Sequence, residues 1–237
     1  EMCIRDSYPA GVAAQVDIPP HLTLVDVLED AMRRYADRPA LRCMERTLSF
    51  GRVDELSQAL AAWLQATGLK PGERVALMMP NVPQYMVAIA AVLRAGYAVV
   101  NVNPLYTARE LEHQLKDSGA KAIIVLENFA STLEEVIDHT EVQHVVVTGL
   151  GDLIGWWKGR FINFAVRHLR KMVPEYHLPL DRGRTASSWR EVIEQGPLRA
   201  LRGRDCASRS GLDQQSAQRR RRVESRPRLR HEARAYR

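Results

Sequence analysis

The stretch between Arg74 and Pro104, RVALMMPNVPQYMVAIAAVLRAGYAVVNVNP, constrains the fold of this chain more than any other. Its first part, Arg74 to Met79, is a short apolar run, which is typical of a strand covered on both faces. Residues 85–93 are nearly all apolar and predict a helix buried on all sides, too short for a membrane span, which needs roughly 20 apolar residues. A β-branched run from Tyr97 to Val102 follows. The stretch therefore predicts a βαβ unit with a right-handed crossover.

Helix ends are marked by polar residues at the start and glycine at the stop. A residue that can cap a helix, followed three positions later by a reciprocal partner, is typical of an N-terminus. The predicted pairs are Thr23 with Asp26, Asn81 with Gln84, Thr107 with Glu110, and Ser188 with Glu191. Glycines 68, 96 and 119 follow predicted helices at positions where a left-handed residue is favoured, and Gly196 follows the last predicted helix.

The remaining elements alternate between strand and helix. The first helix, to about Tyr35, and the helix from Val53 to Ala66 are amphipathic. Their predicted inward residues are Leu24, Val27, Leu28 and Met32 in the first, and Leu56, Leu60, Trp63 and Leu64 in the second. A hairpin (40–44 and 47–50) separates them, and the later elements are a helix from Thr107 to Asp117, strands at 122–126 and 142–148, and helices at 130–138 and from Ser188. The sequence predicts an α/β fold with a mainly parallel sheet flanked by helices.

Residues 149–175 have a different pattern. With a helical period, Ile154, Trp157, Phe161, Phe164, Ala165, Leu169 and Met172 share one face, and Arg160, Arg167, Arg170 and Lys171 lie mostly opposite. Two interpretations stay open. The segment packs its apolar stripe on the protein body, or it docks on an anionic membrane surface through Trp156, Trp157, Phe161, Phe164, Arg167, Arg170 and Lys171.

The formal charge of +6 does not by itself indicate a nucleic-acid-binding protein, because the charge is concentrated at one end. Residues 204–237 hold eleven Arg and four acids, which leaves residues 1–203 at a net charge of −1. This end has few large apolar residues and cannot bury enough surface to fold alone. It predicts a disordered Arg-rich arm that could bind nucleic acid, or a tail translated in the wrong frame; without interleaved aromatic residues, a nucleic-acid partner is the less favoured of these.

Common catalytic signatures are missing from the sequence. It contains no GxxxxGK[ST], GxSxG or HExxH, and its three cysteines and seven histidines show no metal-ligand spacing. The glycines at 149, 151 and 155 resemble a dinucleotide-binding loop, but the last spacing is one residue too long, which favours a plain turn. Taken alone, the residues predict no catalytic, cofactor-binding or metal site.

The amino-acid sequence of the predicted core resembles that of a known family. The run LKPGERVALMMPNVPQYMVAIAAVLRAGYAVVNVNPLYTARELEHQLKDSGAKAIIV is similar to the N-terminal region of bacterial long-chain fatty-acid–CoA ligases, in the adenylate-forming superfamily. FINFAVRHLRKMVPEYHLP resembles a segment of the bacterial long-chain enzymes. The resemblance covers residues 8–201, interpreted as a partial N-terminal α/β domain. It leaves 1–7 as a non-native leader and 202–237 as the disordered or frame-shifted tail.

The resemblance implies a two-step ligation. A fatty acid and ATP give an acyl-adenylate, and coenzyme A then displaces AMP, with ATP, Mg²⁺ and coenzyme A required by the parent enzyme. Members of the family continue with a phosphate loop of the form YTGGTTGxxKG, whereas this chain has RGRDCASRSGLDQQ after residue 201. No family catalytic residue therefore transfers to this chain, which we expect to bind none of these ligands and to be inactive alone.

One group of residues is a candidate for substrate binding. Asn103, Pro104, Tyr106 and Thr107 follow a predicted strand, and open α/β sheets usually bind ligands beyond the carboxyl ends of their strands. A turn followed by a helix cap explains the same residues without a ligand. The chain begins with no apolar leader, and its apolar runs are short. We therefore expect a cytoplasmic location, with or without membrane association.

Overall fold

The computed structural model describes residues 22–43, 46–169, 173–181 and 183–196. The helices are α1 (Leu24–Arg34), α2 (Phe50–Ala66), α3 (Pro83–Arg94), α4 (Ala108–Ser118), α5 (Ala130–Glu134), α6 (Trp156–Phe164) and α7 (Trp189–Gln195). The strands are β1 (Pro39–Cys43), β2 (Arg46–Ser49), β3 (Arg74–Met78), β4 (Ala98–Val102), β5 (Ala122–Leu126), β6 (His144–Thr148) and β7 (Thr185–Ser188). Short 3₁₀ turns η2 (Glu127–Phe129) and η3 (Ile137–His139) and a π-helical turn η4 (Ala165–Leu169) complete the described elements.

The central sheet is parallel throughout its described strands, in the order β4-β3-β5-β6-β7. The β3–α3–β4 unit predicted from the sequence forms, and Val75 lies beside Val99 of β4 and Ala122 of β5. The chain therefore places β3 at the point where the strand order reverses. Strands β1 and β2 form a separate antiparallel hairpin, also as predicted. The α/β fold class is confirmed.

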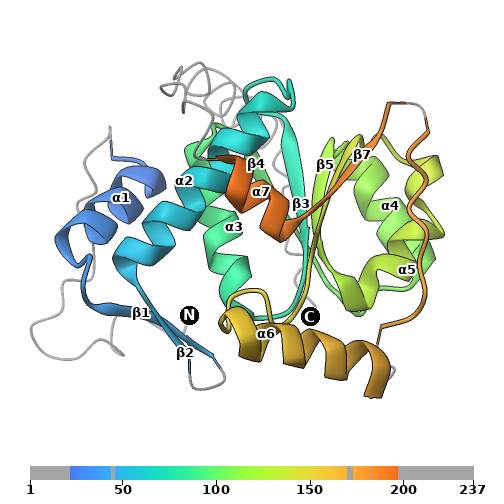
Figure 1. The fold of residues 1–237 in the computed structure, drawn as a ribbon. Helices are drawn as coiled ribbons and strands as arrows, with labels where there is room; N and C mark the ends of the chain where they lie inside the picture. Colours follow the sequence, from blue (N-terminus) through green and yellow to red (C-terminus); the bar gives the residue numbers. More distant parts are fainter. Residues whose placement is uncertain (1–21, 44–45, 170–172, 182, 197–237) are drawn as a thin grey trace, which may run out of the picture.

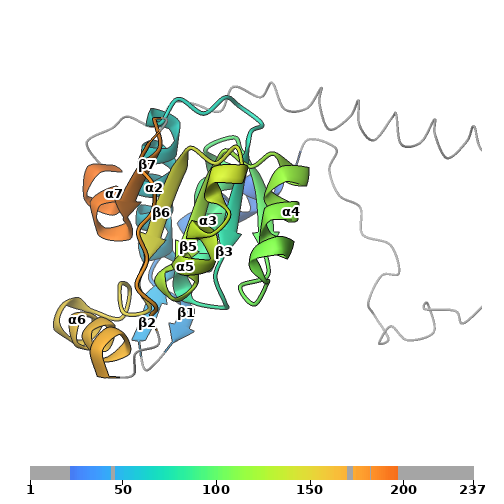
Figure 2. The same ribbon diagram turned by 90° about the vertical axis from the view of Figure 1, so that its right-hand side faces the viewer.

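Helices cover both faces of the sheet (Figures 1 and 2). Side chains of a strand alternate between faces, so Val75 and Leu77 enter a core with α1, α2, α3 and α7. Ala76 and Met78 enter a second core with α4, α5 and η3. Burial on both sides explains why the central strands are continuous apolar runs without polar alternation.

The capping signals predict most helix starts correctly. Thr23, Thr107 and Ser188 each accept a hydrogen bond from the third residue of their helix, whose carboxylate accepts one from the cap backbone. Gly119 ends α4 with φ 59°, a left-handed conformation that costs glycine little. The prediction that Asn81 caps α3 is wrong. Val82 occupies the cap position, and its side chain has no acceptor for a capping bond. Pro83 begins the helix, where its missing N–H leaves one fewer amide unpaired.

Two predicted amphipathic faces require correction. In α1, Met32 is buried and Leu28 packs on the core, but Leu24 and Val27 are exposed. The later turns of α1 meet α3, since Glu29 and Met32 both accept hydrogen bonds from Arg94. In α6 and η4, Phe161 is 64% exposed and Leu169 70% exposed. This segment lies beyond the end of the sheet rather than on a face, so the core does not cover its apolar stripe (Figure 2).

Smaller differences concern the lengths of elements. Helix α2 begins at Phe50 instead of Val53, β6 begins at His144 instead of Val142, and the single helix predicted at 130–138 is α5 followed by η3. Strand β7 was not predicted, because its sequence TASS lacks the apolar run that marks the other sheet strands. The predicted leader (1–7), the first part of the predicted domain (8–21) and the predicted tail (202–237) lie outside the described residues.

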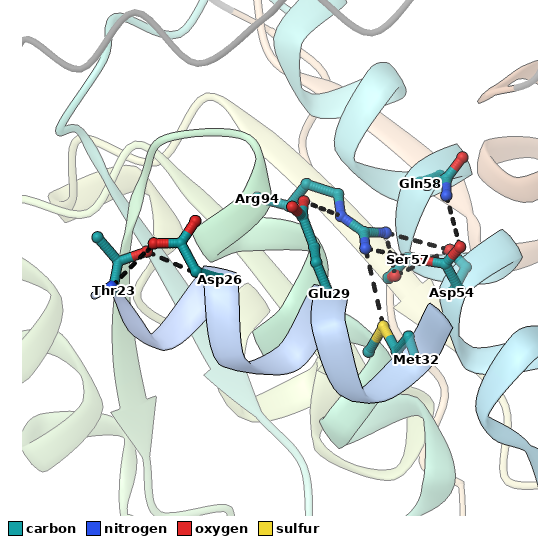
Figure 3. A network of polar contacts seen from close by, with 8 residues as sticks. All are labelled: Thr23, Asp26, Glu29, Met32, Asp54, Ser57, Gln58 and Arg94. Carbon is teal, nitrogen blue, oxygen red and sulfur yellow. Dashed lines mark hydrogen bonds and ion pairs between the residues drawn. The ribbon is translucent and has the colours of Figure 1, made fainter. Parts of the chain in front are cut away.

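A buried arginine joins three helices in the first core (Figure 3). The guanidinium of Arg94, at the end of α3, donates to Glu29 of α1 at 3.1 Å and to Asp54 of α2 at 2.6 Å. It also donates to Ser57 at 2.8 Å, and the Arg94 side chain is only 7% exposed. Two carboxylates and a hydroxyl thus compensate the charge that burial of the guanidinium would otherwise leave unsolvated.

Candidate functional site

The predicted substrate residues form a turn and a helix cap beyond β4, at the edge of the sheet. Asn103 Oδ1 accepts from the Leu105 amide at 3.1 Å, and Thr107 and Glu110 form the capping box of α4. The ring of Tyr106 packs against the second core. These are the contacts expected if the four residues form only a turn followed by a helix cap. None of the four residues lines either cavity described below, and a role in substrate binding stays a prediction.

The carboxyl ends of β5 and β6 carry buried polar groups that the sequence did not predict. Gln84 of α3 is fully buried and donates to the Gly149 carbonyl at 2.9 Å and to Thr148 at 3.4 Å. The loop after β6 turns back through Asp152, whose carboxylate accepts from the Gly149 amide at 2.7 Å. These bonds fix the loop between β6 and α6 against the end of the sheet.

Asn163 of α6 completes the attachment of this loop. Its side chain accepts from the Gly151 amide at 2.6 Å and donates to Asp152 at 2.9 Å. A Cβ on Gly151 would lie 2.2 Å from the Gly159 carbonyl oxygen, so the loop and α6 approach too closely for any side chain at this position. Gly151 therefore permits a close contact with α6, and it lies in a turn over residues 150–154, as the plain-turn interpretation expected.

Glu127 follows β5 and is fully buried. Its Oε2 accepts from Arg167 Nε at 2.8 Å and Nη2 at 2.5 Å, while Oε1 has no hydrogen-bond partner among the described residues. Burial raises the pKa of the Glu127 carboxyl; the Arg167 guanidinium opposes this rise and the charge of Asp152 adds to it. Burial also raises the pKa of the nearby Tyr176. Glu127 is thus a desolvated carboxylate with spare hydrogen-bonding capacity.

A cavity of about 520 Å³ opens beside this carboxylate, and we call it the Glu127 cavity. It lies beyond the carboxyl ends of β6 and β7, where open α/β sheets usually bind ligands. Its polar lining includes Glu127, Asp152, Asn163, Arg167, Tyr176 and Arg190. The combination of a buried carboxylate, guanidinium groups and a phenol can hold a polar ligand that both donates and accepts hydrogen bonds.

A second cavity of about 570 Å³ lies on the other side of Asp152 and Asn163, and we call it the arginine cavity. Strand β2, the start of α2, the loop before α6, helix α6 and helix α7 line it. Its charged lining comprises Arg46, Arg52, Arg160, Arg190, Asp152 and Glu194. Arg190 borders both cavities, so the two hollows form adjoining parts of one polar region at this end of the sheet.

The predicted membrane residues are only partly brought together. Phe161 and Phe164 of α6 are 64% and 54% exposed. Arg167, predicted to face lipid phosphates, instead forms the ion pair with the buried Glu127. Trp156 and Trp157 are the first two residues of α6, but their side chains are outside the part of the chain that is described. Arg170 and Lys171 lie outside the described residues altogether.

Other searches of the described part of the chain concern metals, thiols and membrane spans. No helix in that part is both long and apolar enough to cross a bilayer. Its His, Cys, Asp and Glu side chains do not gather into a group of three that could hold a metal ion. Cys43 is a free thiol. The described residues thus present polar cavities suited to binding, with no assembled metal centre.

Comparison with known proteins defines the class and then the family. The parallel sheet and its flanking helices are similar in fold to parts of solved carboxylic acid reductase and CoA ligase structures. The A-PCP didomain of carboxylic acid reductase from Segniliparus rugosus, in complex with AMP, aligns with a TM-score of 0.62 at 18% identity over 78% of this chain and 28% of that one. A long-chain-fatty-acid-CoA ligase from Archaeoglobus fulgidus aligns with a TM-score of 0.51 at 24% identity, over 63% and 32%. These likenesses concern the fold alone.

Sequence relatives settle the family. The model of the AMP-binding enzyme family matches residues 28–169, and the chain belongs to that family. A long-chain-fatty-acid–CoA ligase of Escherichia coli O157:H7 is 50% identical over 190 residues, 80% of this chain and 33% of the relative. The corresponding ligase of Haemophilus influenzae is 46% identical over 81% of the chain and 34% of the relative. The chain therefore spans about a third of the length of these curated relatives.

Proposed function

We propose that this chain is the N-terminal part of an ATP-dependent long-chain fatty-acid–CoA ligase. The observation that carries the proposal is the 50% identity, over four-fifths of the chain, to bacterial enzymes of that name. The fold supports it, since the parallel sheet and its two helical layers are those of the adenylate-forming class. The proposed role of the described residues is to form the sheet and the polar end of the sheet beside which the rest of the enzyme would assemble.

The proposed reaction of the whole enzyme has two balanced steps. A fatty-acid carboxylate oxygen bonds to the α-phosphorus of ATP, and the bond to the departing pyrophosphate breaks. The sulfur of coenzyme A then bonds to the acyl carbon and its thiol proton passes to solvent, while the bond from that carbon to the AMP oxygen breaks and AMP leaves with the electron pair. The family resemblance implies that the whole enzyme uses Mg²⁺, and the described residues of this chain hold no group of three or more His, Cys, Asp or Glu side chains that could bind it.

We further propose that this polypeptide does not make acyl-CoA by itself and does not bind the ATP, Mg²⁺ or coenzyme A that the parent enzyme requires. The support is the sequence RGRDCASRSGLDQQ, which stands after residue 201 where the family resemblance leads us to expect a Ser/Thr/Gly-rich phosphate loop. A chain of backbone amides in a Gly-rich loop can surround phosphate groups in a way that this sequence cannot.

Acyl-CoA formation from oleate, ATP and coenzyme A tests both parts. The purified chain should give no thioester, whereas a chimera carrying residues 8–201 in place of the matching third of the Escherichia coli ligase should be active. The unaltered ligase, prepared in parallel, is the control. Thioester made by the chain alone would disprove its inactivity, and a folded but inactive chimera would overturn the ligase assignment.

A second candidate function, docking on a membrane surface through residues 152–173, is favoured by the exposure of Phe161, Phe164 and Leu169. Aromatic and aliphatic side chains of an exposed helix can insert at the boundary between headgroups and acyl chains. We expect Phe161→Ser with Phe164→Ser to reduce co-sedimentation with anionic liposomes. The matched control is Leu105→Ser, since Leu105 is 81% exposed beyond β4. An equal loss of co-sedimentation in the α6 double variant and in Leu105→Ser would argue against a membrane site on α6. In this proposal the protein is cytoplasmic and binds the membrane surface from that side.

A further inference from the structure

The arginine cavity has an unusual charge composition for a hollow between packed elements. Four guanidinium groups line it, from β2, α2, α6 and α7, against two carboxylates. Its volume of about 570 Å³ is in the range of small-molecule sites. Because the four arginines come from elements far apart in the sequence, the fold itself gathers these positive charges at one place.

Most of this positive charge has no ion-pair partner in the part of the chain that the structure describes. Among the described residues, Arg46, Arg160 and Arg190 form no ion pair, whereas Arg52 pairs with Glu55 at 2.7 Å. The carboxylate of Asp152 is engaged by the Gly149 amide and by the Asn163 side chain. Glu194 is the remaining carboxylate in the lining. The cavity therefore offers three guanidinium groups to an anion from outside.

We propose that the arginine cavity binds a phosphate group of a ligand, through Arg46, Arg160 and Arg190. Guanidinium groups match phosphate oxygens in paired, charge-assisted hydrogen bonds, and the Thr47 and Ser49 hydroxyls in the lining can donate to the remaining oxygens. The site goes beyond the ligase proposal, which places the phosphate loop for ATP after residue 201. The phosphate can belong to a soluble molecule or to a lipid headgroup, and the experiment separates these sources.

Residue-resolved protection from phenylglyoxal, which modifies accessible arginine, tests the site in the full wild-type chain. Pyrophosphate is the soluble probe, and phosphatidylglycerol vesicles supply the lipid headgroup. We expect modification of Arg46, Arg160 and Arg190 to slow about tenfold when the probe is at ten times its Kd. Arg109 on α4 is the matched control, because it is exposed and unpaired among the described residues but lies outside the cavity. Mass spectrometry of separate peptides keeps the tail arginines out of the measurement.

The outcomes are distinct. Protection of the three cavity arginines by pyrophosphate assigns a soluble ligand, and protection by vesicles alone assigns a lipid headgroup. No protection by either probe, or equal protection of Arg109, overturns the proposal. As a second measurement, Arg160→Gln with Arg190→Gln should weaken pyrophosphate binding by about tenfold or more, and Arg109→Gln should not. Neither measurement uses ligase activity, so its failure is separate from failure of the ligase proposal.

Discussion

Replacement of Arg94 by methionine is the most informative test of how the first core is held together. Methionine keeps most of the apolar volume of the arginine stem but removes its bonds to Glu29, Asp54 and Ser57 (Figure 3). Removing one member of a fully buried ion pair costs about 3–5 kcal/mol. Here Glu29 and Asp54 are 34% and 31% exposed, so both can regain water. We therefore expect a loss of about 2–3 kcal/mol in the free energy of unfolding.

Urea unfolding followed by circular dichroism measures this loss, and Arg33→Met provides the control. Arg33 pairs with Asp30 on α1, but its side chain is 79% exposed. Exposed pairs contribute about 0–1 kcal/mol, so the control should change stability little. If Arg94→Met costs no more than Arg33→Met, the buried network does not stabilise the joint of α1, α2 and α3. A cycle with Asp54→Asn would isolate the energy of that one pair.

Three further predictions follow from the described contacts. Thr107→Ala should lower the free energy of unfolding by about 1 kcal/mol through loss of the α4 cap, and Thr107→Ser should not. If urea unfolding shows that the two variants are as stable as the wild type, Thr107 does not stabilise α4 as a cap. Because burial raises the pKa of Glu127 above its ordinary 4.5, the folded chain holds that proton longer. Stability should therefore fall as pH rises from 4.5 through the folded pKa, and a wild-type pH titration that parallels Glu127→Gln would contradict this. Phe161→Ala should change the free energy of unfolding by under about 0.5 kcal/mol, while Leu115→Ala, at a buried position, should lower it by about 2–5 kcal/mol. Similar losses for the two variants in urea unfolding would contradict the exposure of Phe161.

The sequence predicted those parts of the fold whose causes are local or periodic. The capping boxes at Thr23, Thr107 and Ser188 involve residues three apart, so each could be identified without knowing its surroundings. Strand β5 was predicted with its observed ends because its apolar run is bounded by polar residues. Strand β7 failed the same test. It pairs with β6 through its backbone, which any sequence can do, and its side chains carry no apolar signal.

Amphipathic patterns identified helices more reliably than they identified what those helices contact. The periodicity of residues 154–172 predicted a helix, and α6 with η4 forms within that range. The pattern gives the direction of the apolar face relative to the helix axis only. Whether the sheet covers that face depends on the position in which the preceding loop holds the helix. Here Asp152 and Asn163 fix the loop so that α6 lies beyond the sheet end, and Phe161 remains exposed.

The candidate site was missed for a related reason. Gln84 was predicted as a capping partner for Asn81 because polar residues near a helix start usually serve the helix itself. In the structure it reaches the Gly149 carbonyl, 65 positions away in the sequence. Glu127 and Arg167 are 40 positions apart, and no spacing rule joins them. A buried polar residue within an apolar stretch is the one signal that could have found Gln84 and Glu127, since such a residue needs a partner. The identity of that partner depends on which strand ends the topology places side by side, and so follows only from the folded chain.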